Sequence, residues 1–143
     1  MKVKDILSTP AVSVSENTDI FHVARLMAEN NIGMIPVCAS DGKIRGVITD
    51  RDIVVRAAGE RKDFFETTAS EVMTEDITTV SPMTEIDDVF DIMSEIKVRR
   101  LPVVSENELV GVVTLGDLSQ SLDYSVEISD ALCELCRDCD KEI

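Results

Sequence analysis

The stretch GVITDRDI at residues 46–53 has a counterpart in GVVTLGDL at residues 111–118. Each copy holds an apolar run, a Thr, two further residues and an Asp. A β-branched apolar run predicts a buried strand, and a Thr followed three positions later by an acidic residue favours a helix start. The chain is therefore predicted to form the same strand-to-helix junction twice.

The similarity extends on both sides of these stretches. Residues 3–41 align with residues 69–107 at an offset of 66, and residues 44–53 align with residues 109–118 at an offset of 65. The identical pairs include Val14/Val80, Thr18/Thr84, Ile20/Ile86, Val23/Val89, Met27/Met93, Pro36/Pro102, Val37/Val103, Gly46/Gly111, Thr49/Thr114 and Asp52/Asp117. Such self-similarity marks a tandem repeat. We expect a first repeat at residues 1–60, a linker at 61–68, a second repeat at 69–122 and a C-terminal tail at 123–143.

Each repeat is predicted to have the element order β-α-β-β-α, which places the chain in the α+β class. Strands are expected at residues 11–14, 35–37 and 44–48, and again at 77–80, 101–104 and 109–113. The first helix of each repeat is expected to have Thr18 or Thr84 as its N-cap, and the second to open after Thr49 or Thr114. A three-stranded sheet with two helices is too small to bury both faces alone. We therefore expect the two repeats to pack together about a pseudo-two-fold axis.

The composition excludes several classes of function. The 143 residues carry a formal net charge of −14, with 44% hydrophobic and 3% aromatic residues. Phosphate backbones and anionic lipids repel such a chain, which disfavours general nucleic-acid or membrane-surface binding. No apolar run approaches the ~18–20 residues that span a bilayer. The first residues do not form a secretory signal, and four Cys then indicate reduced thiols in the cytoplasm.

This duplicated unit, with IPV at 35–37 or LPV at 101–103 and GVITDRD at 46–52, resembles the CBS domain. That small module is named after cystathionine β-synthase and nearly always occurs in pairs. The resemblance covers about residues 3–122. It implies a regulatory pair that binds AMP, ADP, ATP, or in some members S-adenosylmethionine or NAD, in clefts between the copies. It also implies homodimers formed through helices, no required cofactor and no reaction of its own, so a separate regulated protein is expected as partner.

The Thr-x-x-Asp motifs have a structural and a functional interpretation. In the structural one, the Thr hydroxyl and the Asp carboxylate cap the first turn of a helix. In the functional one, free N–H groups of the helix start face a phosphate, and the carboxylate accepts hydrogen bonds from ribose hydroxyls. The resemblance implies that Asp52 and Asp117 bind ribose, with Thr49 and Thr114 near the phosphate.

The resemblance also implies that each cleft combines the motif of one repeat with the opening strand and pre-proline residues of the other. The main cleft is then expected to contain Val47, Thr49, Arg51, Asp52, Ile77, Thr78, Val98, Arg99, Arg100 and Pro102. A second, weaker cleft is expected to contain Val12, Ile32, Gly33, Pro36, Val112, Thr114 and Asp117. Apolar residues such as Val47, Val98 and Ile77 are expected to contact the adenine.

The two clefts are expected to differ in charge. Arg51, Arg99 and Arg100 suit an anionic nucleotide because guanidinium groups bind phosphate through two parallel hydrogen bonds. Gly116, Gly33 and Met34 stand at the matching positions of the second cleft. The alternative interpretation of Arg99 and Arg100 is a surface ion-pair cluster with the acidic residues of the neighbouring helix, namely Glu85, Asp87, Asp88, Asp91 and Glu95.

The C-terminal tail has the spacing C-x2-C-x2-C at Cys133, Cys136 and Cys139. Positions three apart on a helix lie on roughly one side, so three thiolates can hold a soft metal, with Cys38 or a second copy supplying the fourth ligand. The simpler interpretation, which we favour, is that these small side chains pack a terminal helix. A metal- or redox-responsive protein and a ligand-free dimerisation scaffold are the alternatives to a nucleotide sensor.

Four single residues complete the expectations. Cys38 is expected in the core, and His22 is expected on the polar side of its helix, facing solvent. Phe64 and Phe65 in the linker are expected to fold back onto a helix.

Overall fold

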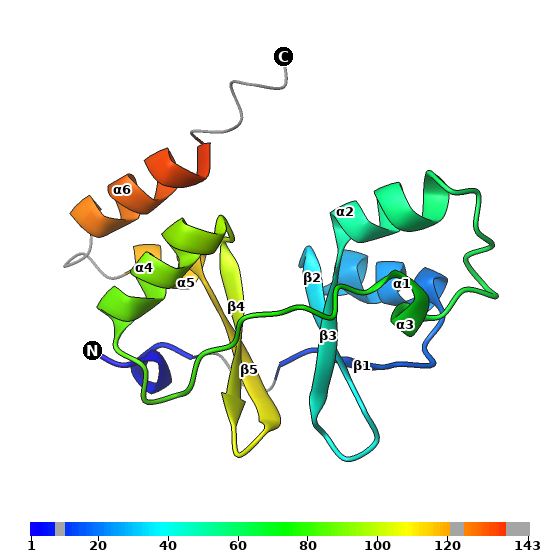
Figure 1. Ribbon diagram of the computed structural model, residues 1–143, viewed down its shortest axis with the longest axis horizontal. Coiled ribbons are helices and arrows are strands. Elements are labelled where there is room, and N and C mark those ends of the chain that lie inside the picture. The colour runs from blue at the N-terminus through cyan, green and yellow to red at the C-terminus, as the bar shows by residue number, and fades with distance from the viewer. Residues whose placement is uncertain (8–10, 121–124, 137–143) are drawn as a thin grey trace. The chain divides into compact units, whose positions relative to one another are not determined.

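The computed structural model describes residues 1–7, 11–120 and 125–136 and divides into two compact units (Figure 1). Unit 1 comprises Met1–Ala11, Thr78–Ser105 and Val110–Ile143, and unit 2 comprises Val12–Ile77 and Glu106–Leu109. The α+β fold is confirmed, with the order β-α-β-β-α complete in the first repeat, and each unit has its own hydrophobic core.

Unit 2 contains a three-stranded sheet of order β1-β2-β3. Its elements are β1 (Val14–Ser15), α1 (Ile20–Asn30), β2 (Met34–Cys38), β3 (Ile44–Thr49), α2 (Asp50–Asp52), η2 (Ile53–Ala58) and α3 (Ala69–Val72). Strand β1 pairs in parallel with β2, and β2 pairs antiparallel with β3, which places Met34 opposite Thr49. Helix α1 buries Ile20, Val23 and Met27, the apolar residues at helical spacing. The segment η2 is a π-helix that continues α2 without a break.

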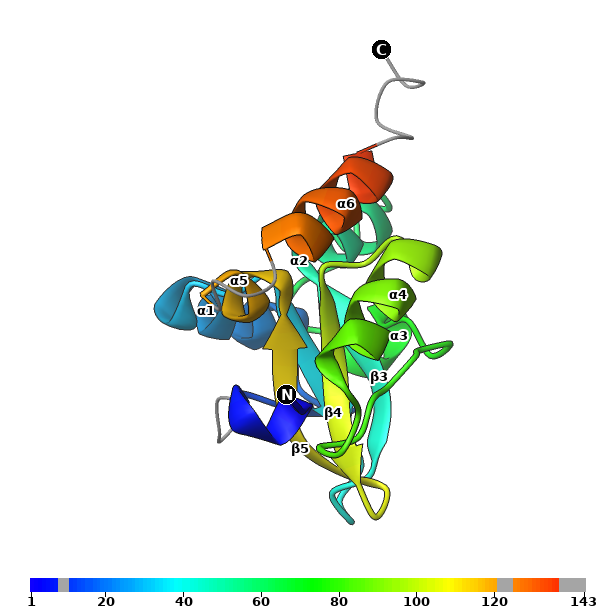
Figure 2. The ribbon, with the colours of Figure 1, turned by 90° about the vertical axis from the view of Figure 1, so that its left-hand side faces the viewer.

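Unit 1 repeats this plan with a smaller sheet. Its elements are η1 (Val3–Asp5), α4 (Ile86–Ile96), β4 (Arg100–Ser105), β5 (Glu108–Thr114), α5 (Leu115–Ser119) and α6 (Ser125–Cys136), and the first two residues of β5 belong to unit 2. Strands β4 and β5 form a two-stranded sheet. The strand expected at 77–80 is reduced to one parallel bridge between Val80 and Val103. Helix α6 packs against α4 and α5 (Figure 2).

The N-caps of α1 and α4 lie one residue later than expected. Asp19 caps α1, because its side chain accepts a hydrogen bond from the His22 N–H at 2.9 Å. Glu85 is at the N-cap position of α4. The prediction of Thr18 and Thr84 was wrong because both residues serve the preceding turns: the Thr18 hydroxyl bonds the Ser15 hydroxyl, and the Thr84 hydroxyl accepts the Ser81 N–H.

Each repeat places its opening segment in the unit that contains the rest of the other repeat. Val3, from η1, is fully buried in the core of unit 1, whereas Ala69 and Val72, from α3, are fully buried in the core of unit 2. Full burial of a Val side chain stabilises a fold by about 1.5–3 kcal/mol. Each unit therefore depends on residues from both repeats.

Two equivalent glycines allow these opening segments to approach the sheets closely. A Cβ atom on Gly46 of β3 would lie 2.6 Å from the Thr74 carbonyl oxygen, and one on Gly111 of β5 would lie 2.6 Å from Cδ1 of Leu7. Val47 and Thr74 exchange two backbone hydrogen bonds, of 3.0 and 2.8 Å. The absence of a side chain at Gly46 is thus required for this pairing.

The four single-residue expectations have mixed outcomes. Phe64 packs against the core of unit 2, whereas Phe65 is 68% exposed and stacks on Phe21 of α1 with ring centroids 4.7 Å apart. His22 is exposed, as expected. Cys38 is only half-buried, because it is the last residue of β2, and its expected place in the core was wrong.

Candidate functional site

The first Thr-x-x-Asp motif lies in unit 2, where β3 ends and α2 begins. The Thr49 hydroxyl accepts the Asp52 N–H at 3.1 Å, and Oδ2 of Asp52 accepts the Thr49 N–H at 2.9 Å. This reciprocal pair is a capping box, which satisfies amide groups that a helix start leaves without partners. The structural interpretation of the motif is therefore confirmed for this repeat.

The second motif forms the same box in unit 1. The Thr114 hydroxyl accepts the Asp117 N–H at 3.1 Å, and Oδ2 of Asp117 accepts the Thr114 N–H at 2.9 Å. The Thr114 hydroxyl also donates to Oδ2 of Asp117 at 2.8 Å. In both boxes Oδ2 makes the capping bond, so Oδ1 of each Asp takes no part in the cap. An oxygen of this kind has the acceptor capacity that ribose hydroxyls require.

The pre-proline residues of each repeat lie beside the motif of the same repeat. The Asp50 N–H donates to the Gly33 carbonyl at 3.1 Å, and the Leu115 N–H donates to the Arg99 carbonyl at 2.8 Å. These bonds come from equivalent positions in the repeats. They fix the start of the middle strand against the start of the short helix in each unit.

The residues expected in each cleft divide between the two units. Of the main set, Val47, Thr49, Arg51, Asp52 and Ile77 lie in unit 2, and Thr78, Val98, Arg99, Arg100 and Pro102 lie in unit 1. Of the second set, Val112, Thr114 and Asp117 lie in unit 1, and Val12, Ile32, Gly33 and Pro36 lie in unit 2. The pairing of the halves across units stays a prediction.

The apolar residues expected around the adenine keep part of their surface exposed. Val12, Ile32, Val47, Ile77, Val98 and Val112 are all half-buried, whereas Pro36 and Pro102 are buried in their strands. A half-buried aliphatic side chain is anchored by its own core and still offers surface to a ligand.

Arg99 and Arg100 do not form the ion-pair cluster considered as their alternative role. Across residues 1–7, 11–120 and 125–136, no ion pair involves either guanidinium group. Glu85, at the start of α4, is paired instead with Lys2 at 2.7 Å and with the N-terminal amine at 3.6 Å. The hydrogen bond from Lys2 lowers the pKa of Glu85.

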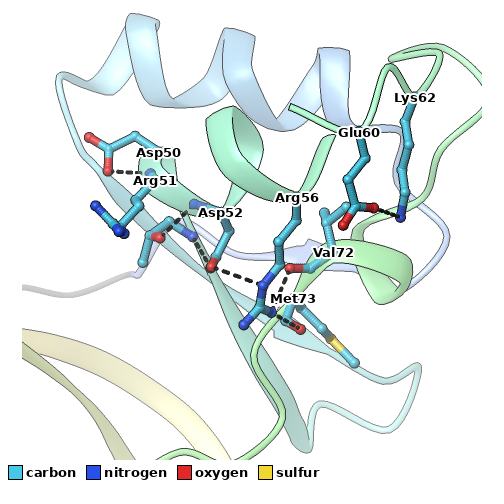
Figure 3. A network of polar contacts seen from close by, with 9 residues as sticks. Asp50, Arg51, Asp52, Arg56, Glu60, Lys62, Val72 and Met73 are labelled. Atoms are coloured by element: carbon cyan, nitrogen blue, oxygen red, sulfur yellow. Dashed lines mark hydrogen bonds and ion pairs between the residues drawn. The ribbon is translucent and has the colours of Figure 1, made fainter. Parts of the chain in front are cut away.

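One basic residue near the first motif was missed by the sequence analysis. Nε of Arg56, in η2, lies 3.8 Å from Oδ1 of Asp52, and Nη1 donates to the carbonyls of Val72 and Met73 at 3.2 and 3.1 Å (Figure 3). The Asp52 side chain is 13% exposed and that of Arg56 is 46% exposed. Arg56 could have been found from the sequence because it follows Asp52 by four positions, and residues four apart on a helix are neighbours.

The cysteines of the tail are described only in part. Cys133 is exposed on α6, whereas the side chain of Cys136 and all of Cys139 lie outside the described residues. Burial raises the pKa of the Cys38 thiol, and a hydrogen bond with Ser13 partly offsets this rise. Within the described ranges no group of three or more His, Cys, Asp or Glu side chains is placed to hold a metal ion. The metal prediction for Cys133, Cys136 and Cys139 remains a prediction.

Among the described residues, no helix combines the length and the hydropathy that a membrane span requires.

The fold and the paired boxes define a class of protein built from two copies of one small α+β module. The chain belongs to the CBS domain family, whose model matches residues 3–59 and 69–124. The CBS domain-containing protein YhcV of Bacillus subtilis is 40% identical over 117 residues, which cover 82% of each chain.

Two solved structures connect this family to bound groups. The structure of Hypoxic Response Protein I with two coordinated zinc ions has a TM-score of 0.80 and 34% identity, over 85% of this chain and 99% of that one. Hypoxic response protein 1 of Mycobacterium tuberculosis is also 34% identical over 132 residues. The CBS domain pair of protein MJ0100, in complex with 5′-methylthioadenosine and S-adenosylmethionine, has a TM-score of 0.75 and 32% identity, over 84% of this chain and 94% of that one.

Proposed function

We propose that this protein is a regulatory sensor that binds an adenosine-containing ligand between its two CBS repeats and transmits occupancy to a partner protein. The main support for the proposal is the arrangement of the two carboxylate oxygens of Asp52. Its Oδ2 makes the capping bond, while Oδ1 lies outside the cap beside one guanidinium group. A fixed carboxylate with a spare oxygen is suited to accept ribose hydroxyls, as acidic residues do in dinucleotide folds. The adenosine ligands of the MJ0100 pair support the same ligand class.

The charge of the main site favours an anionic nucleotide, such as AMP, ADP or ATP. Arg51, Arg99 and Arg100 are the basic residues of this set, and the side chains of Arg99 and Arg100 make no ion pair with a described carboxylate. Guanidinium groups bind phosphate strongly when they are not already paired. The Asp117 site, with Gly116, Gly33 and Met34 in place of the arginines, is proposed to bind weakly or to take a less charged ligand.

The residues of the two Thr-x-x-Asp motifs also support a regulatory role without catalysis. In both motifs the Thr hydroxyl and the Asp carboxylate are used in a capping box, so we propose a binding protein and not an enzyme. A ligand that contacts both repeats favours one of their arrangements over others, and a dimer partner or a regulated protein responds to that shift. We also propose a homodimer that acts in the cytoplasm.

A thermal-shift screen tests the proposal. The wild-type protein is heated with AMP, ADP, ATP, NAD, S-adenosylmethionine and 5′-methylthioadenosine in separate samples, with inosine monophosphate and inorganic phosphate as controls. A ligand that binds only the folded state raises the melting temperature by mass action. Stabilisation by one or more adenosine ligands, and not by phosphate alone, is the expected result. No shift with any of them, up to millimolar concentration, would refute the sensor function.

A metal-binding role for the tail is the second candidate, favoured by the zinc ions of the Hypoxic Response Protein I structure and by the C-x2-C-x2-C spacing. Elemental analysis of protein purified without oxygen tests it. A stoichiometric metal that is lost in Cys133→Ser supports this role, and metal at background level ends it.

A further inference from the structure

The two oxygens of the Asp52 carboxylate have different surroundings. Oδ2 is held at 2.9 Å by the Thr49 N–H inside the capping box. Oδ1 lies 3.8 Å from Nε of Arg56, within ion-pair range but too far for a hydrogen bond. The guanidinium therefore attracts Oδ1 electrostatically and leaves its lone pairs available for a donor from a ligand.

Arg56 is itself fixed from the other side. Its Nη1 donates to the carbonyl oxygens of Val72 and Met73, at the C-terminal end of α3. The last carbonyls of a helix have no partner within the helix, and a cation that bonds them is favoured. One rigid, planar group thus joins the Asp52 carboxylate to the end of α3 (Figure 3).

The segment that Arg56 holds leads directly to the candidate site. Thr74 pairs with Val47 of β3, and three residues later the chain reaches Ile77, an expected adenine contact. Arg56 therefore forms an ion pair with the carboxylate that would receive ribose and hydrogen bonds with the start of the second repeat.

The second repeat does not have this residue. Position 121, which aligns with Arg56 at the offset of 65, is a Ser and lies outside the described residues. A Ser side chain is too short and uncharged to attract the Asp117 carboxylate in the same way. In the part of the chain that the structure describes, no ion pair involves Asp117, so the arrangement around Asp52 has no counterpart there.

We propose that Arg56 is a positioning residue of the nucleotide site: it orients Oδ1 of Asp52 toward the ribose hydroxyls and links that oxygen to the end of α3. This inference rests on the proposed sensor function and assigns the ribose specificity of the site to a residue outside the Thr-x-x-Asp motif. Arg56 acts through Asp52 and needs no contact with the ligand.

The test compares the affinity for AMP with that for 2′-deoxy-AMP, measured by calorimetry. If Asp52 accepts both ribose hydroxyls, the wild type is expected to bind AMP about tenfold more tightly than 2′-deoxy-AMP. This ratio corresponds to the loss of one hydrogen bond to a charged group. Arg56→Met keeps the apolar stem and removes the guanidinium, and Arg56→Gln keeps an amide donor for the carbonyls of α3. In both variants the preference for AMP is expected to fall to about twofold or less, whereas Arg56→Lys is expected to restore part of it.

Arg25→Met is the matched control. Arg25 pairs with Glu29 at 3.0 Å on the exposed face of α1 in the same unit, so its ion pair involves neither Asp52 nor α3. The ratio of the two affinities separates positioning from a merely structural role, because a destabilised site loses affinity for AMP and 2′-deoxy-AMP equally. Circular dichroism and the melting temperature show that each variant is folded.

The outcomes distinguish this inference from the proposed function. If the wild type binds AMP with a clear preference over 2′-deoxy-AMP and both Arg56 variants keep that preference, only the role of Arg56 is overturned. If the wild type binds the two nucleotides equally, Asp52 does not recognise the 2′-hydroxyl and the inference also fails. If AMP does not bind, the adenosine ligand that the thermal-shift screen identifies and its 2′-deoxy analogue replace the pair. If no ligand of that screen binds, the sensor function fails together with the inference.

Discussion

The Thr-x-x-Asp boxes of the two repeats have the same bonds but different neighbours. The amide of the Thr lies 2.9 Å from Oδ2 of the Asp in both, and the returning bond is 3.1 Å in both. Asp52, however, has Arg56 near its second oxygen, whereas Asp117 receives an extra bond from the Thr114 hydroxyl. The box is thus a structural device that each repeat needs to start its second helix. We propose that residues outside the box decide whether it also serves a ligand.

The largest expected effect is a difference in AMP binding between the variants of Asp52 and Asp117. Asp52→Ala is expected to weaken AMP binding about a hundredfold, since it removes hydrogen bonds from two ribose hydroxyls to a charged acceptor. Asp117→Ala is expected to change AMP binding less than about threefold, because the matching positions of its site carry no arginine. Calorimetry with AMP and ATP checks both variants. Equal losses from the two changes would show that the sites are equivalent.

The second largest expected effect is the loss of stability when each of the two equivalent glycines is replaced by Ala. Gly46→Ala drives a methyl group against the Thr74 carbonyl and is expected to lower the free energy of unfolding by about 3 kcal/mol. Gly111→Ala meets mainly the terminal atoms of Leu7, which can rotate away, and is expected to lower it by about 1 kcal/mol. Urea unfolding followed by circular dichroism measures both. A larger loss at Gly111 would mean that Leu7 is held as firmly as the backbone at Thr74.

The Thr hydroxyls of the two capping boxes are expected to contribute differently to the free energy of unfolding. Thr49→Val removes one acceptor and is expected to lower the free energy of unfolding by about 1 kcal/mol, a typical value for an N-cap. Thr114→Val is expected to lower it by about 2 kcal/mol, because its hydroxyl also donates to Asp117 at 2.8 Å. The same urea titration measures them, with the exposed Thr79→Val as control. Equal losses would indicate that the additional bond contributes nothing net.

The smallest expected effect concerns pH and the start of α3. Hydrogen bonds from the Thr68 N–H and hydroxyl lower the pKa of Glu71 below its ordinary value. A lowered pKa in the folded state gives stability that is present above the unfolded value, about 4.3 for Glu, and is lost as the pH falls through the folded value. Glu71→Gln should therefore melt slightly below the wild type at pH 7 and at the same temperature as the wild type in acid.

Thermal scans across the acid range, with Glu66→Gln as control, check this dependence. A difference between wild type and Glu71→Gln that grows as the pH falls would contradict the assigned sign.

Much of the fold follows from local pattern. The β-branched runs and the 3.6-residue spacing of Ile86, Val89 and Met93 predicted elements that the structure contains, since both signals arise from which face is buried. The capping boxes were also predictable, because each needs only four consecutive residues. The N-caps of α1 and α4 were not, because Thr18 and Thr84 have an equally good hydroxyl role in the preceding turn.

What sequence could not supply was contact between distant segments. From the sequence, Arg56 is expected to be an exposed helical residue. Only the fold places its guanidinium at the Val72 carbonyl. The assignment of Val3 to unit 1 likewise depends on tertiary packing, because η1 is adjacent in sequence to the first repeat and not to the second.

The exchange of opening segments bears on how a paired protein of this kind could arise. The opening segment of each repeat is buried in the core of the unit that contains the rest of the other repeat. A lone ancestral repeat would thus have been complete only beside a second copy, each inserting its first residues into the other. In a chain that joins two repeats, an exchange that would depend on concentration between separate copies is intramolecular. Because two repeats within one chain need not be identical, one of them can carry a basic residue such as Arg56 where the other has Ser121.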